Sequence, residues 1–259
     1  MNIVVCVKQV PDTYTERTLR PEDSTLDRAA ADGLINELDE YAIEEGLRLT
    51  EANGGEVTIL SVGPERAAES IRKALSMGAD KAVHVSDEGL HGSDALVTSE
   101  VIAKVLGRIG FDLVILGSES TDARMGVMAA MLAERLGVPQ LSYASKVETD
   151  GTTISINRQA DYGYDTVEGS LPAVVSVVEK INEPRYPSFK GIMAAKKKPV
   201  ETLSLADLEL DAAQAGLAAS GTEVIDFAKR PPRQAGTIVT DEGDGGVKAA
   251  EFLASRKFI

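Results

Sequence analysis

The chain opens with residues 2–7, Asn-Ile-Val-Val-Cys-Val, an almost unbroken apolar run. A short run of this kind is typical of a strand that is covered on both faces of a sheet. Similar runs recur at residues 56–62, 81–85 and 112–116. Patterns with helical spacing fall between these runs. The order of elements therefore predicts an α/β domain whose parallel strands are joined by right-handed crossovers.

The expected helices occupy residues 38–52, 65–77, 93–107 and 124–136, and the last three end at or just before a glycine. Beyond Pro139 the pattern changes to that of short strands separated by turn signals. We expect these strands to extend the sheet as an antiparallel edge; they are residues 141–148, 152–159 and 172–178.

The predicted domain division falls at residue 181, because residues 182–259 are polar and contain many glycines and prolines. One short helix is expected at residues 246–256. A segment this long with little core of its own is unstable by itself. It nevertheless carries apolar residues that a disordered tail does not need: Ile192, Met193, Leu203, Leu205, Leu208, Val224, Ile225 and Phe252. We therefore expect residues 1–181 to form the domain and residues 182–259 to form an arm that wraps on another protein.

The composition excludes several classes of function. The 259-residue chain has a formal net charge of −14, which disfavours binding to nucleic acid or to an anionic membrane. One cysteine (Cys6) and two histidines (His84 and His91) do not provide the ligands of a zinc or iron–sulfur site, so no metal is expected. No apolar run reaches the length of a membrane span or resembles a signal peptide, so a cytoplasmic location is expected.

The most informative loop is residues 117–127, Gly-Ser-Glu-Ser-Thr-Asp-Ala-Arg-Met-Gly-Val, which follows the fourth strand and opens a helix. Open α/β sheets bind ligands at this edge, where a helix N-terminus offers its amides to phosphate. The loop matches neither GxxxxGK[ST] nor GxGxxG. The loop predicts either a nucleotide site or a plain capped helix with Asp122 as the N-cap. The second interpretation is favoured by Glu119 and Asp122, which put negative charge where a phosphate would lie.

The end of the first strand supplies further candidates. Lys8 can neutralise a phosphate or be a solvated strand end. Asn36 and Asp39 can hold a ribose or an adenine, although Asn36 is also a common helix start. Cys6 is more typical of a small buried apolar residue than of a reactive thiol. The two histidines lack neighbours at ligand spacing and are interpreted as structural or surface residues.

A basic patch stands out in this acidic chain, where residues 196–198 are three consecutive lysines and Lys190 lies nearby. Such a run is usually a solvated face. Next to Phe189 in a proline-containing loop it also fits a docking surface, in which an apolar anchor is surrounded by charge. Both interpretations remain open from the residues alone.

Several motifs resemble one known family. They are Lys-Gln-Val-Pro-Asp-Thr at residues 8–13, Ala-Leu-Ser-Met-Gly-Ala-Asp at 74–80, Leu-Pro-Ala-Val-Val at 171–175, Asn-Glu-Pro-Arg-Tyr at 182–186 and Ile-Met-Ala-Ala-Lys-Lys-Lys at 192–198. Together they resemble the signatures of the β subunits of electron-transfer flavoproteins, and the likeness spans essentially the whole chain.

This resemblance implies a Rossmann-like body, similar to the adenine nucleotide alpha hydrolase folds, and an arm that clasps an FAD-carrying α subunit. The shared FAD would take electrons from acyl-CoA or related dehydrogenases and pass them to a quinone reductase or another acceptor. The chain would be a carrier subunit rather than a complete enzyme, so no catalytic residue is expected in it.

The resemblance also implies site residues, because the family holds AMP, or a second FAD in bifurcating members, in this subunit. The positions that match this nucleotide site are Cys6, Asn36, Asp39, Val62, Gly117, Ser118, Ser120, Thr121, Asp122, Met125, Gly126 and Val127. Lys8 is included with them because it can neutralise a phosphate. Val10, Asp12 and Thr13 would lie near the flavin. The positions that match the family's partner-recognition loop are Glu183, Arg185, Tyr186, Phe189, Ile192, Met193, Lys196 and Lys197.

One departure concerns the nucleotide loop. Many family members carry a longer acidic stretch with D-x-D and Q-x-G, whereas here only three residues separate Asp122 from Gly126. The choice between AMP and a second FAD therefore stays open, and with it the question of electron bifurcation.

Two other classes of function were weighed from the residues. A nucleotide-hydrolysing or nucleotide-activating enzyme of this fold would need a Gly/Ser-rich loop after the first strand, where the chain has Gln-Val-Pro-Asp at residues 9–12. A homodimeric stress protein that senses nucleotides would have no use for an arm of this length.

Overall fold

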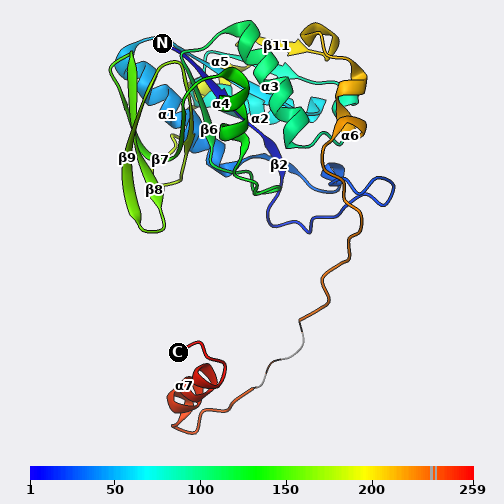
Figure 1. Ribbon diagram of the computed structural model, residues 1–259, viewed down its shortest axis with the longest axis vertical. Helices are drawn as coiled ribbons and strands as arrows, with labels where there is room; N and C mark the ends of the chain where they lie inside the picture. Colours follow the sequence, from blue (N-terminus) through cyan, green and yellow to red (C-terminus); the bar gives the residue numbers. More distant parts are fainter. Residues whose placement is uncertain (234–235, 237) are drawn as a thin grey trace. The chain divides into compact units, whose positions relative to one another are not determined.

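The computed structural model describes residues 1–233, 236 and 238–259, and Figure 1 draws its helices and strands. Contacts divide the described chain into two units, Met1–Val224 and Ile225–Ile259. The first unit, called the body below, contains the sheet and the candidate site. The second is called the C-terminal unit, and its described residues include one helix.

Among the described residues, nine strands form one sheet in the order β11-β5-β4-β1-β6-β10-β7-β8-β9. Neighbouring strands from β11 to β7 pair in parallel, and β7, β8 and β9 pair antiparallel. The strands are β1 (Asn2–Cys6), β4 (Glu56–Val62), β5 (Lys81–Val85), β6 (Leu113–Gly117), β7 (Gln140–Thr149), β8 (Thr153–Ala160), β9 (Gly163–Ser170), β10 (Ala173–Val177) and β11 (Val200–Leu203). A separate antiparallel pair joins β2 (Gln9–Pro11) to β3 (Gly33–Ile35).

Helices cover both faces of the sheet (Figure 1). α1 (Glu37–Asn53) and α2 (Ala68–Met77) pack on one face, and α3 (Ala95–Ile109) and α4 (Met128–Leu136) pack on the other. β1 is apolar on both faces and therefore needs this cover. Ile3 and Val5 join the apolar cluster on the side of α1 and α2, while Val4 joins the cluster on the side of α3 and α4. The two-sided burial predicted for residues 2–7 is confirmed, and so is the predicted α/β fold with a largely parallel, Rossmann-like sheet.

The remaining helical elements are shorter. They are α5 (Phe189–Ala195), α6 (Gly216–Ala219), α7 (Gly245–Ser255) and the 3-10 turns η1 (Arg28–Ala30), η2 (Glu65–Ala67), η3 (Glu88–Leu90), η4 (Ala206–Leu208) and η5 (Ala212–Gln214).

The strand predicted at residues 172–178 has a different place from the one expected. β10 lies between β6 and β7 and is parallel to both, whereas an antiparallel edge strand was predicted. All five of its residues are buried, so it needs cover on both faces, which an interior position provides. The antiparallel edge consists of β7, β8 and β9 instead. β9 was not predicted, and its alternating exposure fits an edge strand.

Two helix boundaries also differ from the prediction. α3 continues through Gly107 to Ile109, and Gly110, with a φ of 70°, ends it. α4 begins at Met128 rather than at residue 124, because the preceding residues form an ordered loop that is used in the candidate site.

Residues 182–224 pack against residues 1–181, so the contacts divide the chain after Val224 and not at the expected residue 181. β11 pairs in parallel with β5 and extends the sheet by one strand. Leu203, Leu205 and Leu208 are at most 5% exposed and join the apolar cluster under α3. These leucines attach the segment to the apolar core. The polar composition of residues 182–259 did not indicate this packing.

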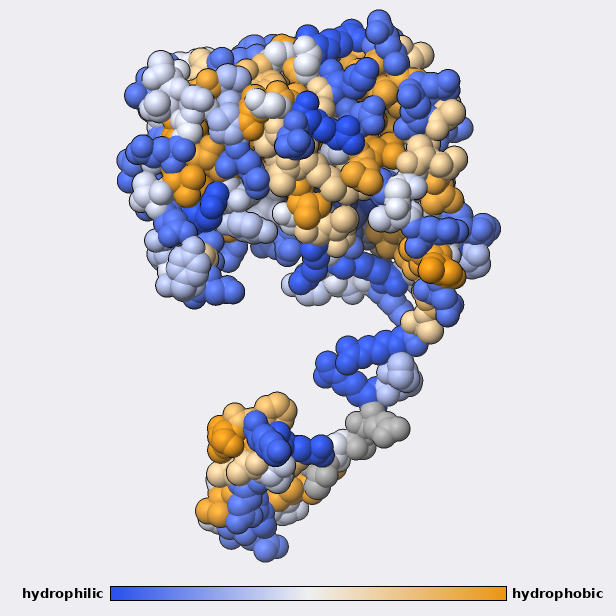
Figure 2. Space-filling model, viewed as in Figure 1, coloured by the Kyte–Doolittle hydropathy of each residue, from blue (hydrophilic) through white to orange (hydrophobic). Residues whose placement is uncertain are grey.

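The C-terminal unit contains α7, close to the helix predicted at residues 246–256. None of the side chains of α7 is buried, and Val247, Phe252 and Leu253 are exposed. Figure 2 shows apolar surface beside charged surface on this unit. Within the described part of the chain, no helix is both long and apolar enough to cross a bilayer.

Candidate functional site

The buried carboxylate of Asp39, near the start of α1, is hydrogen-bonded to the carboxyl ends of β1 and β6. Asp39 Oδ2 accepts a hydrogen bond from the Lys8 amide at 2.7 Å, and Asp39 Oδ1 accepts one from Asn36 Nδ2 at 2.9 Å. The Gly117 amide also donates to this carboxylate, whose burial raises the pKa of Asp39 to about 7. A Cβ at position 117 would lie 2.7 Å from Asp39 Oδ1, so the strand end requires a glycine there.

Asn36 connects this point to the loop that follows β6. Its Nδ2 donates to the Glu119 carbonyl at 3.0 Å, and its Oδ1 accepts a hydrogen bond from the Thr121 amide at 3.1 Å. Asn36 is the N-cap residue of α1, yet its side chain caps no amide of that helix. The side chain therefore holds the loop rather than the helix.

Asp122 is the centre of an ion cluster, defined here as Lys8, Arg28 and Asp122. The Asp122 side chain is 1% exposed, and its oxygens lie 2.8 Å from Lys8 Nζ and 2.8 Å from Arg28 Nη2. Burial raises its pKa, but the charges and hydrogen bonds of the cluster outweigh burial and lower the pKa of Asp122 to about 2. The carboxylate therefore stays ionised, facing two cations.

The predicted helix-cap role of Asp122 is wrong. The N-cap position of α4 is Val127, and no side chain caps that helix. Asp122 instead turns inward, where charge-assisted hydrogen bonds to the two cations stabilise its carboxylate. Sequence reasoning missed Arg28, which lies 94 positions away in the loop after β2.

Two hydroxyl groups at this edge are buried without a hydrogen-bond partner in the described part of the chain: Thr121 Oγ1 and Ser61 Oγ. Ser120 Oγ, by contrast, already accepts a hydrogen bond from Lys8 Nζ at 3.2 Å. A buried hydroxyl without a partner is costly, so such atoms indicate a place where a ligand or water completes the bonding.

The other residues predicted for the nucleotide site differ in how far they are buried. Cys6 is buried, and burial raises the pKa of its thiol to about 12, so it is a small neutral wall residue. Val62 ends β4 and is half-buried, Ser118 donates its amide to Val177, and Met125 is exposed. Gly126 has a φ of 65°, which favours glycine, and leads into Val127.

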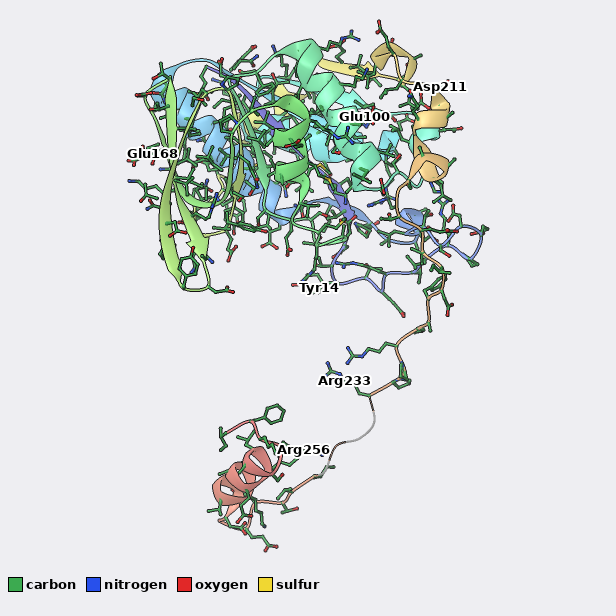
Figure 3. The ribbon with its side chains drawn as sticks, in the orientation of Figure 1. Tyr14, Glu100, Glu168, Asp211, Arg233 and Arg256 are labelled. Carbon is green, nitrogen blue, oxygen red and sulfur yellow. The ribbon has the colours of Figure 1, made fainter. Side chains whose placement is uncertain are left out.

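The predicted flavin-facing residues lie on β2 and the loop that follows it. Val10 is buried, Asp12 is half-buried and Thr13 is exposed. Tyr14, labelled in Figure 3, follows them on this loop and is almost fully exposed. Arg66, which sequence reasoning missed, holds the loop by donating to the Arg28 and Ala31 carbonyls, at 2.6 and 2.9 Å.

A second candidate surface is the docking segment, defined here as residues 183–198. Its helix α5 is capped by Ser188, whose Oγ accepts a hydrogen bond from the Gly191 amide at 3.0 Å. Phe189 is 80% exposed, and the other outward-facing predicted residues are Glu183, Tyr186, Ile192, Met193, Lys196 and Lys197. Arg185 is the exception among the predicted partner residues, because it bonds to α1 rather than facing outward.

Comparison with known proteins shows the family of the chain. A family model described as "Electron transfer flavoprotein domain" matches residues 23–208. The electron transfer flavoprotein subunit beta of Mycobacterium tuberculosis is 53% identical over 264 aligned positions, which cover 100% of this chain and 99% of the relative. The chain belongs to the electron transfer flavoprotein family, among its beta subunits.

More distant members of the family match over a similar length. The beta subunit of Mycobacterium leprae is 52% identical, and that of Thermoanaerobacterium thermosaccharolyticum is 37% identical over 100% of both chains. The family match runs on to Leu208, the last residue of η4, past the division expected at residue 181. It therefore includes β11 and the leucines that attach residues 182–224 to the body.

Proposed function

We propose that this chain is the β subunit of a heterodimeric electron carrier, in which FAD is held together with an α subunit. The observation that carries the proposal is the likeness to electron transfer flavoprotein beta subunits over the whole chain. The carrier would take electrons from acyl-CoA or related dehydrogenases and deliver them to a quinone oxidoreductase or another acceptor. The exposed apolar side chains of α7 support a role for the C-terminal unit in holding the α subunit.

The edge around the ion cluster would hold an adenine nucleotide, either AMP or a second FAD. Two cations face one carboxylate there, which leaves a net positive charge for phosphate, and Thr121 Oγ1 has an unused hydrogen-bonding capacity. The first amides of α4 add the positive end of a helix dipole. AMP would have a structural role, whereas a second FAD would supply the redox chemistry of bifurcation.

Residues 10–13 would form part of the wall beside the shared flavin. Arg66 holds the chain on either side of these residues through three acceptors: Gln9 Oε1 at 3.1 Å and the Arg28 and Ala31 carbonyls. A fixed loop limits the motion and water access of a neighbouring group. Its contribution is positional, because none of its side chains is proposed to exchange electrons.

The docking segment would bind the client dehydrogenase. Phe189, Ile192 and Met193 present apolar surface, and three exposed lysines, Lys190, Lys196 and Lys197, surround it on a chain of net charge −14. This pattern fits a dehydrogenase with an apolar pocket and an acidic rim.

Phe189→Ala is expected to weaken dehydrogenase coupling by about 1–3 kcal/mol, the range for the loss of an interface anchor. The measurement is flavin reduction in the heterodimer at increasing concentrations of an acyl-CoA dehydrogenase supplied with its substrate. The apparent KM should rise while the FAD content stays unchanged. Tyr164→Ala, which removes an exposed aromatic side chain from β9, is the matched control. Unchanged transfer kinetics in Phe189→Ala would remove this residue from the proposal.

A further inference from the structure

The cations of the docking segment divide into two groups. Lys190, Lys196 and Lys197 are exposed, whereas Arg185 and Lys198 are only partly exposed and donate their hydrogen bonds inward to the body. The segment is thus attached near both ends by charged side chains. Between these attachments lies α5, whose apolar side chains face outward.

Arg185 attaches the first end to α1. Its Nε and Nη2 lie 2.7 and 2.9 Å from the two carboxylate oxygens of Glu44, and its Nη1 and Nη2 lie 2.6 and 3.1 Å from those of Glu51. The Arg185 amide also donates to Glu44, whose side chain is 8% exposed. Two bidentate pairs on one guanidinium fix both the position and the direction of the chain.

Lys198 attaches the other end to the end of α2. Its Nζ lies 3.0 Å from the Leu75 and Gly78 carbonyls and 2.5 Å from that of Ala79, which uses all three ammonium donors. A cation at these last carbonyls also faces the negative end of the helix dipole. Arg72, within α2, donates back to the Lys198 carbonyl at 3.2 Å.

The middle of the segment rests directly on α2. A Cβ at Gly191 would lie 2.5 Å from the Ser76 carbonyl oxygen, so the backbones of α5 and α2 are in contact there. Ala195, near the end of α5, is buried in the body, and its carbonyl accepts a hydrogen bond from Arg72 at 2.6 Å. Attachment at both ends and contact in the middle leave α5 one orientation.

We infer that Arg185 and Lys198 are positioning residues, which hold α5 in the orientation that its redox partner binds and do not contact that partner themselves. The inference rests on the proposed function, since it assigns these residues to the same docking event. Binding to a surface that is already ordered avoids the entropy cost of ordering it during docking. Under this inference Arg185 would hold the docking segment in place, whereas the sequence predicted that it contacts the partner.

The test uses the full heterodimer and the single variants Arg185→Met and Lys198→Met. Each is expected to raise the apparent KM for an acyl-CoA dehydrogenase about tenfold, with kcat changed by less than about twofold. Without the dehydrogenase, the amides of residues 189–195 should exchange with deuterium faster in both variants. Lys198→Arg, which retains donors for the carbonyls, should restore most of the wild-type behaviour.

Lys197→Met is the matched control, because it removes an exposed cation from the same segment. It should raise KM by loss of charge but leave the exchange of residues 189–195 unchanged. If Arg185→Met fails to fold, Glu51→Gln weakens the same attachment at an exposed carboxylate and should still accelerate the exchange.

Wild-type exchange and KM in both methionine variants would overturn the inference. An intact heterodimer whose flavin no dehydrogenase reduces would instead contradict the proposed function. In that case the exchange measurement would still test whether Arg185 and Lys198 hold α5 in place, because this measurement needs no dehydrogenase.

Discussion

Deletion of residues 225–259 is expected to leave the body folded, whereas deletion of residues 182–259 is expected to unfold it. The longer deletion removes β11 and the buried side chains of Leu203, Leu205 and Leu208. Removing a buried leucine side chain costs about 2–5 kcal/mol, and three such losses reach the whole stability of a typical domain, about 5–15 kcal/mol. The shorter deletion removes only the C-terminal unit, Ile225–Ile259, and leaves β11 and these three leucines in place.

Thermal unfolding followed by circular dichroism separates these two outcomes. The chain ending at Val224 should unfold cooperatively near the wild-type midpoint, and the chain ending at Ile181 should show no cooperative transition. A wild-type midpoint for the chain ending at Ile181 would contradict the packing of residues 182–224. Under the proposed function, the chain ending at Val224 should also fail to co-purify with the α subunit, while the full chain succeeds.

Asp122→Ala is expected to lower the stability of the full-length chain by about 2 kcal/mol, because it leaves Lys8 and Arg28 facing each other. The loss stays below that of a fully buried pair, since water reaches both cations, whose side chains are 38% and 37% exposed. In a chain of this size the unfolding midpoint should fall by about 5 °C. Asp161→Ala, at an exposed turn between β8 and β9, is the matched control.

Added AMP distinguishes a ligand site from a purely structural ion cluster. If phosphate binds between the two cations, AMP should raise the midpoint of Asp122→Ala more than that of the wild type, because the competing carboxylate is gone. An Asp122→Ala chain with the wild-type midpoint would contradict the ion cluster. If Asp122→Ala is destabilised but AMP does not raise its midpoint, the ion cluster is structural and phosphate does not bind between its cations.

Local patterns predicted much of the fold. The apolar runs at residues 2–7 and 112–116 carry their own signal, because a strand covered on both faces must be apolar at every position. β10 has the same signal, but its pairing partners depend on how the chain returns across the sheet, which no local pattern encodes. β11 has only four residues, two of them exposed, so its pairing with β5 is apparent only in the folded chain.

The candidate site was predicted in part for a similar reason. The loop after β6 was found from its place at a strand end, and the structure brings Asn36, Asp39 and Asp122 together there. Arg28 and the inward turn of Arg185 were missed, because their ion pairs join residues 94 and 141 positions apart. The structure shows why the second pair forms, because Glu44 is buried on α1 and a buried acid requires a partner.

Counting the flavin and adenine nucleotide bound after co-expression with an α subunit tests whether the two chains hold FAD together. We expect a heterodimer that retains FAD, with either AMP or a second FAD in addition, while the β chain expressed alone does not retain the shared FAD. One flavin with one AMP would identify a conventional carrier, and two flavins would point to bifurcation. A chain that stays monomeric in the presence of the α subunit, or that turns over substrate unaided, would contradict the proposed function.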